Sequence, residues 1–457
     1  MKVSDFEKYV HAGARGHLIG IGGVSMSPLA EVLLDRGLKI TGSDTNDGDT
    51  VAHLRSLGIE VAIGHRAENV SGAEFVVRTA AVHDENPEIV EARRLGIPVF
   101  ERAQAWGCIM RGYKNAFCIS GAHGKTTTTS MTAHILMAAQ TDPTIMVGGT
   151  LPLLKAGHRI GGGDTIVMES CEYYNSFLSF SPTIATILNV DEDHLDFFKN
   201  LDEIKASFRK FAELVPKDTG YVVVNGDNEN AMDAIRGIDR RIFTFGLGEG
   251  VDFRGVNVAV KNGFTCFDIE YDGEFFAHIE LKVPGLHNVV NALAAAAGTM
   301  LFGVPAEAVV RGLSDFTGAS RRFEYKGEVN GAKVYDDYAH HPSELRALIE
   351  AVRTLDFERI ILAFQPHTYS RTKSFFKEFA DELSKADKVF LAEIYAAREQ
   401  NAFGISSADL AREVPGAVFC PSFSELEEKL RETAREGDII LTVGAGNIYL
   451  VGENLVK

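Results

Sequence analysis

Two glycine-containing loops in the chain carry residue types that bind phosphate groups. The first, GIGGVSMS at 20–27, is one residue short of the dinucleotide-binding fingerprint G-x-G-x-x-G, because Ser25 occupies the third glycine position. The second, SGAHGKTTTT at 120–129, combines glycines with a lysine and threonines. Backbone N–H groups in such a loop surround a phosphate, the lysine adds positive charge, and a hydroxyl reaches a magnesium ion. Two such loops predict two phosphate-bearing ligands.

The second loop is the stronger motif because of the segments that flank it. An apolar run at 116–120 predicts a strand before the loop, and residues 127–139 predict a helix after it, whose N-terminal end favours an anion. The spacing is not that of G-x-x-x-x-G-K-T, because Ile119 stands at the first glycine position. A glycine turn followed by a surface lysine is the alternative. The residues expected to hold nucleotide phosphates are Gly121, Gly124, Lys125, Thr126 and Thr127.

Acidic residues follow two further predicted strands. ESCE at 169–172 comes after the apolar run TIVM, and DEDHLD at 191–196 comes after IATILNV. Ligands bind at the carboxyl ends of parallel strands, and magnesium prefers oxygen ligands. Beside a nucleotide loop these acids therefore predict a metal site. The alternatives are solvated loop acids and, for His194, an ordinary surface histidine.

Strands alternate with helices along the whole chain. Short apolar runs followed by helices that end in glycine indicate βαβ units and parallel sheets, so the fold class is α/β. Three such regions are predicted, over 1–112, 113–319 and 320–457. Within the second, alternating residues around Asn262-Gly263 and Asp272-Gly273 predict hairpin turns and a small antiparallel patch.

Composition and charge exclude several classes of protein. The 457 residues are 45% apolar and 24% charged, as in a soluble globular protein, and no stretch approaches the roughly 20 apolar residues of a membrane helix. The first residues lack the apolar core of a signal peptide. Five scattered cysteines indicate a reducing compartment, and a net charge of −17 argues against nucleic-acid binding. A cytoplasmic protein without membrane insertion is expected.

Further motifs complete a pattern. In chain order the motifs are GIGGVSMSPLA, GSD, GAHGKTTTT, ESCEYYNSFL, NVDEDHLD, PGLHNVVNALAA, SRRFE, DDYAHHPSE, FQPHTYSRT and GAGNIY. With them the chain resembles, over its full length, the Mur ligases, ATP-dependent amide-forming enzymes of peptidoglycan synthesis. The likeness is greatest to the members that add L-alanine to UDP-N-acetylmuramate. The resemblance implies an N-terminal Rossmann-like UDP-binding domain, a central P-loop ATPase domain with the antiparallel patch, and a C-terminal Rossmann-like domain that closes over the site.

The resemblance also implies a reaction. ATP phosphorylates the lactyl carboxylate of the sugar, and the amine of the amino acid attacks the acyl phosphate, so that phosphate leaves. Arg322 is implied to reach the γ-phosphate of ATP, whereas His341 and Arg371 face the sugar carboxylate and the incoming amino acid. Lys125 and His194 complete the residues implied to act in the chemistry.

Binding roles are implied in the same way, for ATP and Mg²⁺ as cofactors and for UDP-N-acetylmuramate and L-alanine as partners. The implied metal ligands are Thr126, Glu172 and His194. The implied contacts of ATP outside the loop are Asn288 and Asn291 at the adenine and Asp337 at the ribose. In the first loop, Gly22 and Gly23 are expected to face a diphosphate, with Ser43 or Asp44 on the uridine side.

Each role has a structural alternative. The two asparagines are also typical of a helix start, Asp337 of a turn, and His341 of a helix entrance before proline, while Arg322 is also explained by a surface ion pair. The chain departs from the family pattern at three positions, which are Ser25, Ala122 and Thr368.

Other functions remain open at this level. A ligase that recycles a murein tripeptide onto UDP-N-acetylmuramate shares the chemistry, and folylpolyglutamate synthetase shares the central loop. An NAD-dependent oxidoreductase is the alternative from the first loop and Asp44, although the Lys125 loop would then have no role. A non-catalytic nucleotide-binding protein would not need Glu172 and His194. The oligomeric state is expected to be a monomer or a homodimer.

Overall fold

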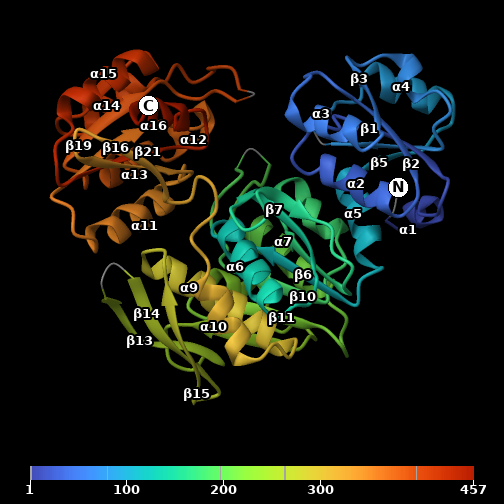
Figure 1. Cartoon of the computed structure of the whole chain (residues 1–457), viewed down its shortest axis with the longest axis horizontal. Coiled ribbons are helices and arrows are strands. Elements are labelled where there is room, and N and C mark those ends of the chain that lie inside the picture. The colour runs from blue at the N-terminus through green and yellow to red at the C-terminus, as the bar shows by residue number, and fades with distance from the viewer. Residues whose placement is uncertain (1–2, 80, 196, 262–263, 398) are drawn as a thin grey trace. The chain divides into compact units, whose positions relative to one another are not determined.

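The computed structural model describes residues 3–79, 81–195, 197–261, 264–397 and 399–457. The chain forms two compact units, and Figure 1 shows its helices and strands coloured along the sequence. Unit 1 contains Met1–Thr150, Leu154–Phe245 and Ala297–Val304, and unit 2 contains Leu151–Leu153, Gly246–Ala296 and Pro305–Lys457.

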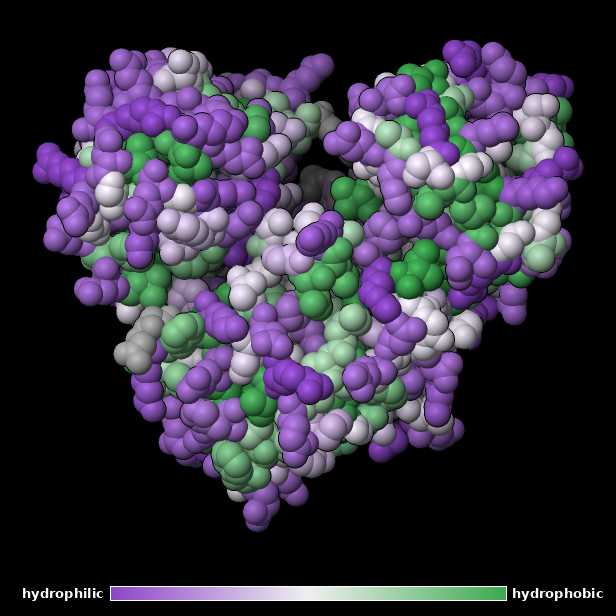
Figure 2. All heavy atoms as spheres, viewed as in Figure 1, coloured by the Kyte–Doolittle hydropathy of each residue, from purple (hydrophilic) through white to green (hydrophobic). Residues whose placement is uncertain are grey.

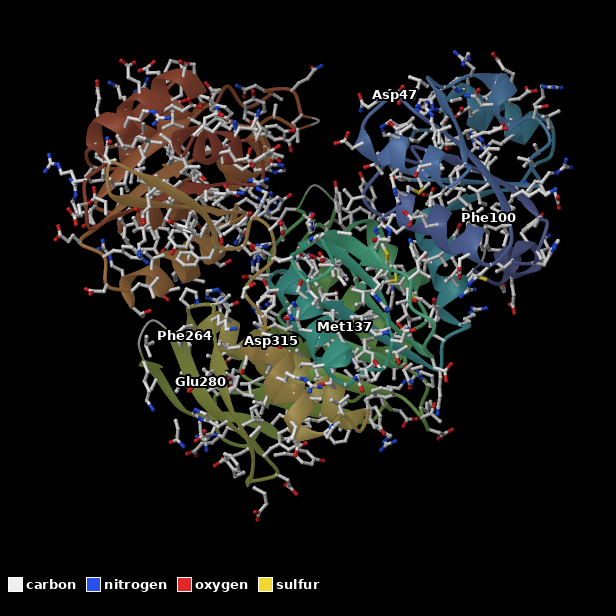
Figure 3. All side chains as sticks on the ribbon, in the orientation of Figure 1. Asp47, Phe100, Met137, Phe264, Glu280 and Asp315 are labelled. Atoms are coloured by element: carbon white, nitrogen blue, oxygen red, sulfur yellow. The ribbon has the colours of Figure 1, made fainter. Side chains whose placement is uncertain are left out.

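Unit 1 begins with a parallel sheet in the order β3-β2-β1-β4-β5. Its strands are β1 (Arg15–Ile19), β2 (Lys39–Asp44), β3 (Glu60–Ile63), β4 (Phe75–Arg78) and β5 (Val99–Glu101). The helices between them are α1 (Val3–Phe6), η1 (Glu7–Tyr9), α2 (Ser27–Asp35), α3 (Asp49–Ser56), η2 (Ala67–Val70), α4 (Pro87–Arg94) and α5 (Arg102–Met110). Aromatic rings form part of the hydrophobic core beside this sheet. Phe6 packs edge to face on Phe75 and on Phe100, which Figure 3 labels.

The second sheet of unit 1 follows the order β12-β11-β10-β6-β9-β7-β8. Its strands are β6 (Asn115–Ser120), β7 (Thr144–Leu151), β8 (Ala156–Arg159), β9 (Thr165–Glu169), β10 (Ile184–Ile187), β11 (Tyr221–Asn225) and β12 (Ile242–Gly246). Its helices are α6 (Lys125–Ala138), η3 (Tyr173–Ser179), α7 (Leu201–Glu213) and α8 (Glu229–Ala234). Strand β6 pairs in parallel with β9 and β10, so the three strands end at the same edge of the sheet.

Unit 2 begins with an antiparallel patch, seen as the yellow-green strands of Figure 1. Strands β13 (Phe253–Lys261), β14 (Phe264–Tyr271) and β15 (Glu274–Leu281) form it. They are followed by helix α9 (Leu286–Leu301), of which 286–296 belong to this unit, and by α10 (Ala306–Ser314). The turn predicted at Asp272-Gly273 joins β14 to β15, and both residues have positive φ angles (50° and 78°). The turn predicted at Asn262-Gly263 lies outside the described residues.

The last sheet of unit 2 has the order β16-β17-β21-β18-β19-β20 and is parallel except for β16. Its strands are β16 (Glu324–Val329), β17 (Ala332–Asp337), β18 (Arg359–Phe364), β19 (Lys388–Ala392), β20 (Val418–Cys420) and β21 (Asp438–Val443). Its helices are α11 (Pro342–Arg353), α12 (Tyr369–Ser374), α13 (Phe376–Leu383), α14 (Ser407–Glu413), α15 (Phe423–Thr433) and α16 (Tyr449–Leu455). The predicted α/β class is therefore confirmed.

Polar side chains dominate the face seen in Figure 2, with small hydrophobic areas between them. None of the helices in the described ranges combines the length and the apolar composition needed to cross a bilayer.

Candidate nucleotide and substrate sites

The Lys125 loop connects β6 to α6 and needs glycine at two positions. Gly124 has φ 83° and ends the loop in the left-handed conformation just before the helix. Gly121 has φ 152°, and a Cβ atom there would lie 2.9 Å from the Cβ of Leu188. The backbone N–H groups at the start of α6 therefore stand at the carboxyl edge of the sheet, as a phosphate-binding loop requires.

Lys125 is held by the loop and by a carboxylate. Its Nζ donates to the carbonyl oxygens of Gly121 and Ala122 and to Glu172, where the distance to Oε2 is 3.1 Å. The Lys125 side chain is 13% exposed and that of Glu172 3%. Burial lowers the pKa of Lys125, but Glu172 and neighbouring acids outweigh it and raise this pKa above its usual value. The ammonium group is therefore charged and points toward the mouth of the loop.

Glu172 and His194 converge from two strand ends, as the sequence predicts. His194 Nε2 lies 3.7 Å from Glu172 Oε1 and 3.8 Å from Asp193 Oδ2. Its ring stacks on Tyr173, with centroids 4.3 Å apart, and its φ of 54° fixes a turn after β10. The Cys171 thiol completes a group of three metal-type donors whose atoms lie within 4.8 Å of one another.

Asn189 supports the loop in a way that the sequence analysis missed. Its side-chain Oδ1 accepts from the N–H of His123 at 2.8 Å, and its Nδ2 donates to the carbonyl oxygen of the same residue at 3.1 Å. The amide therefore clamps the tip of the loop onto the strand end. Asn189 opens the motif NVDEDHLD, in which the sequence indicates only the acids and His194 as functional residues.

The first loop lines a pocket of about 500 Å³ in the N-terminal part of unit 1. Gly20, Gly22 and Gly23 line it together with Asp44, which ends β2. Asp44 Oδ2 accepts a hydrogen bond from the N–H of Gly22 at 2.9 Å, and Oδ1 accepts from Asn46. The loop amide and the acid predicted on the uridine side therefore meet in one pocket.

Ser25, which replaces the third glycine, has specific partners. Its hydroxyl is hydrogen bonded to the guanidinium of Arg102, and its carbonyl oxygen accepts from Trp106 Nε1 at 3.2 Å. Both partners belong to α5. The serine thus ties the first loop to α5, and a glycine at this position could not make the side-chain bond.

Ser43 has a different environment from Asp44. Its side chain is fully buried and donates to the carboxylate of Glu88 at 2.7 Å. The same carboxylate contacts His65 Nδ1 at 3.1 Å, and His65 lines the pocket. Burial disfavours the ionised form of Glu88, but hydrogen bonds from neighbours that include His17, Asn69 and Ser43 outweigh it and lower its pKa to about 2. Ser43 is therefore linked to the pocket indirectly, through Glu88 and His65.

This buried carboxylate predicts an acid-sensitive contribution to stability. Because the pKa of Glu88 falls from 4.5 to about 2 in the folded chain, its ionised form stabilises the fold above pH 4.5 and loses that effect as the pH drops through 2. We expect Glu88→Gln to lower the free energy of unfolding by about 3 kcal/mol at pH 7. Urea unfolding at pH 7 and at pH 3 measures this, and an equal loss at both values would contradict it.

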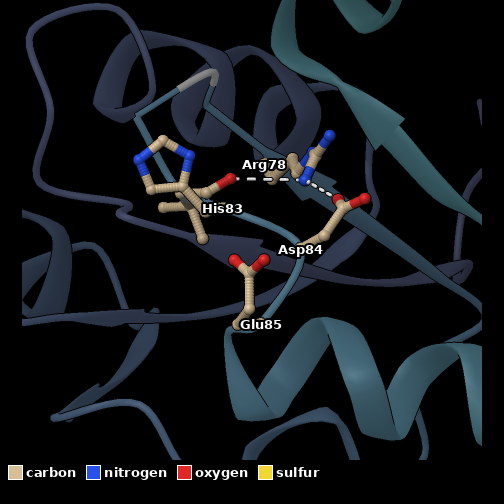
Figure 4. A pocket seen from close by; sticks show the side chains of 5 residues that line it. Arg78, His83, Asp84 and Glu85 are labelled. Carbon is tan, nitrogen blue, oxygen red and sulfur yellow. Dashed lines mark hydrogen bonds and ion pairs between the residues drawn. The ribbon is translucent and has the colours of Figure 1, made fainter.

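A second pocket, of about 410 Å³, lies beside the first loop's pocket and shares Val82 with it. Figure 4 shows Arg78 between the carbonyl of Val82 and the carboxylate of Asp84. Glu101 also accepts from Arg78, at 2.7 Å. This arginine is therefore already neutralised, and the pocket offers less to an anion than the loop amides do.

The two arginines of the SRRFE motif in unit 2 have different environments. Arg321 is tied to Asp336 and to the carbonyl oxygens of Gly444 and Gly446. Arg322 has a looser environment, with its guanidinium over the Tyr338 ring and 3.9 Å from Glu344.

Asp337 ends β17 and is 8% exposed. Its carboxylate accepts from the N–H groups of Phe323 and Ala339, both at 2.8 Å. Burial is the largest influence on this group and raises its pKa to about 6. The turn anticipated as the structural alternative is present, and the two contacts place Asp337 between the Arg322 segment and the histidine pair.

The motifs DDYAHHPSE and FQPHTYSRT of unit 2 meet at the carboxyl ends of β17 and β18. The rings of His340 and His367 are 5.7 Å apart, and Arg371 Nη1 lies 3.3 Å from His367 Nδ1. His341 caps α11 and packs edge to face on Phe375. Thr368 caps α12 with φ 64°, a conformation that its branched side chain disfavours.

Asn288 and Asn291 lie on the first turns of α9 and are both buried. Asn288 Nδ2 donates to the carbonyl oxygen of Pro284 at 2.7 Å, and Asn291 donates to Asn288. The asparagines thus have the helix-start role that was the structural alternative, and an adenine contact stays a prediction.

The predicted site residues therefore fall into separate groups. In unit 1 the structure brings together Lys125, Glu172 and His194, and elsewhere Gly22, Gly23 and Asp44. In unit 2 Arg322 and Asp337 are close enough to interact electrostatically, and His341 and Arg371 belong to motifs joined by the His340–His367 contact.

Comparison with known proteins identifies the family. Three family models match in succession, described as the Mur ligase family, catalytic domain (15–114), the Mur ligase middle domain (119–299) and the Mur ligase, glutamate ligase domain (321–446). A curated UDP-N-acetylmuramate–L-alanine ligase of Caldanaerobacter subterraneus is 46% identical over 99% of this chain and 98% of its own length. The chain belongs to the Mur ligase family.

Solved structures agree with this Mur ligase assignment. The crystal structure of a UDP-N-acetylmuramate-alanine ligase from Thermotoga maritima is 30% identical, covers 97% of this chain and 98% of its own, and has a TM-score of 0.80. A murein peptide ligase from Psychrobacter arcticus, 22% identical with a TM-score of 0.72 over 97% of this chain and 98% of its own, shares the fold. Mur ligases are ATP-dependent ligases, so the NAD-dependent alternative is not retained.

Proposed function

We propose that the chain is a UDP-N-acetylmuramate–L-alanine ligase. The observation that carries this proposal is the likeness at 46% identity to an enzyme of that name, which extends over both chains almost completely. The phosphate loop with Lys125, the Glu172–His194 pair and the glycine-walled pocket with Asp44 supply the binding groups that two phosphate-bearing substrates need.

For ATP, the loop amides and Lys125 bind the phosphates. Gly121, Gly124, Thr126 and Thr127 shape this binding site, and Arg322 neutralises charge that develops on the transferred γ-phosphoryl group. Asn288, Asn291 and Asp337 are proposed to contact the adenosine part.

A magnesium ion fits the donors at this loop. Glu172 supplies carboxylate oxygens and His194 an imidazole nitrogen within 3.7 Å, and Thr126 lies in the first turn of α6. The ion would neutralise negative charge on the phosphate groups. Because Lys125 donates to Glu172, the carboxylate lies beside the phosphate loop.

The reaction also requires residues that hold the UDP-sugar and alanine in the correct orientation. An oxygen of the lactyl carboxylate attacks the γ-phosphorus, the bond to the β-phosphate oxygen breaks, and ADP leaves. The neutral amine of alanine then attacks the acyl carbon, loses a proton, and the C–O bond to phosphate breaks. We propose that His341 and Arg371 orient the carboxylates of the sugar and of alanine, and that Gly22, Gly23 and Asp44, with Ser43 behind them, position the UDP part.

A substrate panel tests the proposal. We expect ADP and phosphate to form only when ATP, Mg²⁺, UDP-N-acetylmuramate and L-alanine are all present, with omission of any one reducing release at least about 100-fold. Coupled measurement of phosphate together with mass spectrometry of the product checks both halves of the reaction. Equal turnover with the L-Ala–γ-D-Glu–meso-diaminopimelate tripeptide would favour the recycling ligase, and no turnover with alanine would reject the proposal.

A further inference from the structure

The outer face of the antiparallel patch in unit 2 carries four metal-type donors on two neighbouring strands. Cys266 on β14 lies directly opposite Glu280 on β15, and Asp268 lies directly opposite His278. Residues two apart on a strand share a face, so all four side chains lie on the same side of the sheet. The apolar residues between them, such as Phe267 and Ile279, are buried on the other side. Figure 3 labels Glu280 on this patch.

Three of these side chains are close enough to share one ion. A ligand atom from each of Cys266, His278 and Glu280 lies within 4.8 Å of those of the other two. The distance from His278 Nε2 to Glu280 Oε1 is 3.9 Å. A tetrahedral zinc ion with bonds of about 2.0–2.3 Å separates its donors by about 3.5 Å. Glu280 is exposed and can rotate by the remaining distance, whereas the thiol is buried.

The fourth residue orients the histidine. Asp268 Oδ1 lies 2.5 Å from His278 Nδ1, which leaves Nε2 directed toward Glu280. The Nδ2 of Asn257 donates to Asp268 Oδ2 at 2.7 Å and holds the carboxylate in place. Asn257 has φ 54° beside the bulge in β13 that brings its side chain over the strand. A carboxylate on the outer nitrogen of a histidine is the usual support of a metal-bound imidazole.

We propose that Cys266, His278 and Glu280 bind a thiophilic divalent cation, with zinc the best match, and that Asp268 positions His278 for it. A thiolate together with an imidazole and a carboxylate favours zinc, since thiolate is a soft ligand that magnesium does not take up. The ion fastens β15, the end strand of the sheet, to β14. The proposal is independent of the ligase reaction, since none of these residues is assigned to ATP or to the substrates.

Cobalt(II) is the probe that tests this site, because a cobalt–thiolate bond adds near-ultraviolet absorption that cobalt bound to oxygen and nitrogen lacks. The chelator-treated full chain is titrated with Co²⁺, and metal content is measured after dialysis. We expect thiolate absorption that Cys266→Ser abolishes and that added Zn²⁺ bleaches. Cys171→Ser is the matched control, because Cys171 is the thiol of the other three-donor group among the described residues. Absence of the absorption in the native chain, or its full retention in Cys266→Ser, overturns the proposal.

The role of Asp268 has its own readout. We expect Asp268→Asn to weaken Co²⁺ binding about 10- to 100-fold while the absorption at saturation remains, because the three ligands are still present. Glu274→Gln, an exposed change on β15 outside the cluster, should leave the affinity unchanged. Ligase turnover and far-ultraviolet circular dichroism should be native in Asp268→Asn and in Glu274→Gln. An unchanged affinity in Asp268→Asn contradicts the positioning role.

Discussion

Replacing Lys125 with methionine is expected to reduce ligase turnover by about 1,000-fold or more. The ammonium group sits at the mouth of the phosphate loop, held by two loop carbonyls and Glu172, where the β- and γ-phosphates of ATP would be bound. Methionine retains the length of the side chain but removes the charge. Steady-state release of phosphate at saturating substrates measures the loss, and a variant with near-native turnover would remove the loop from the mechanism.

The same substitution has a separate effect on stability, which a second variant isolates. Without Lys125, the carboxylate of Glu172 is buried with no opposing ammonium group, at a cost of about 3–5 kcal/mol. We expect thermal unfolding at a lower temperature in Lys125→Met and substantial recovery in the double variant Lys125→Met/Glu172→Gln. Turnover should stay low in both variants. Recovery of activity together with stability would show that the first loss came from unfolding alone.

Gly107→Ala is expected to be among the most damaging single-methyl changes in unit 1. Gly107 lies in α5, and a Cβ atom there would overlap the backbone carbonyl oxygen of Ser179. The carbonyl oxygen of Gly107 also accepts from the hydroxyl of Ser181, so the two segments cannot separate without losing that bond. We expect a loss of about 3 kcal/mol or more and an unfolding temperature lower by roughly 5–10 °C.

Gly298→Ala provides the matched control, because it adds the same methyl group to a helix, α9. The new Cβ would lie 3.7 Å from the Phe117 ring, an ordinary van der Waals contact. Alanine also favours helix over glycine by up to about 1 kcal/mol. We expect stability equal to the native chain or slightly higher, measured by calorimetry. Equal losses in the two variants would show that the contact with Ser179 is not what matters at Gly107.

The sequence predicted the residues of the phosphate loop better than the distant residues that hold the two loops in place. Strand, loop and helix around Lys125 follow from an apolar run, glycines and helix-forming residues, each of which acts over a few neighbours. Glu172 and His194 could be placed at one sheet edge because parallel strands end together. The clamp from Asn189 and the Ser25–Arg102 bond join residues that are 66 and 77 positions apart, and no local pattern specifies such pairs.

Ser43 illustrates the same limit. Its position at the end of β2 predicts a place near the first loop, and that place is observed next to Asp44. Side chains alternate along a strand, however, so that its hydroxyl meets Glu88 while Asp44 lines the pocket. Which of the two would face the ligand depended on the register of the strand, which the motif GSD alone does not determine.

Nucleotide binding would replace the ion pair between Lys125 and Glu172 with two new ones, in which a phosphate pairs with Lys125 and a divalent ion with Glu172. A bare phosphate would have to draw the lysine from a carboxylate that is almost completely buried and would leave that carboxylate without a cation. A nucleotide that arrives with its own divalent ion offers each partner a replacement. We therefore expect the ion pair to disfavour free phosphate and sulfate, and metal and nucleotide to raise each other's affinity by the same factor.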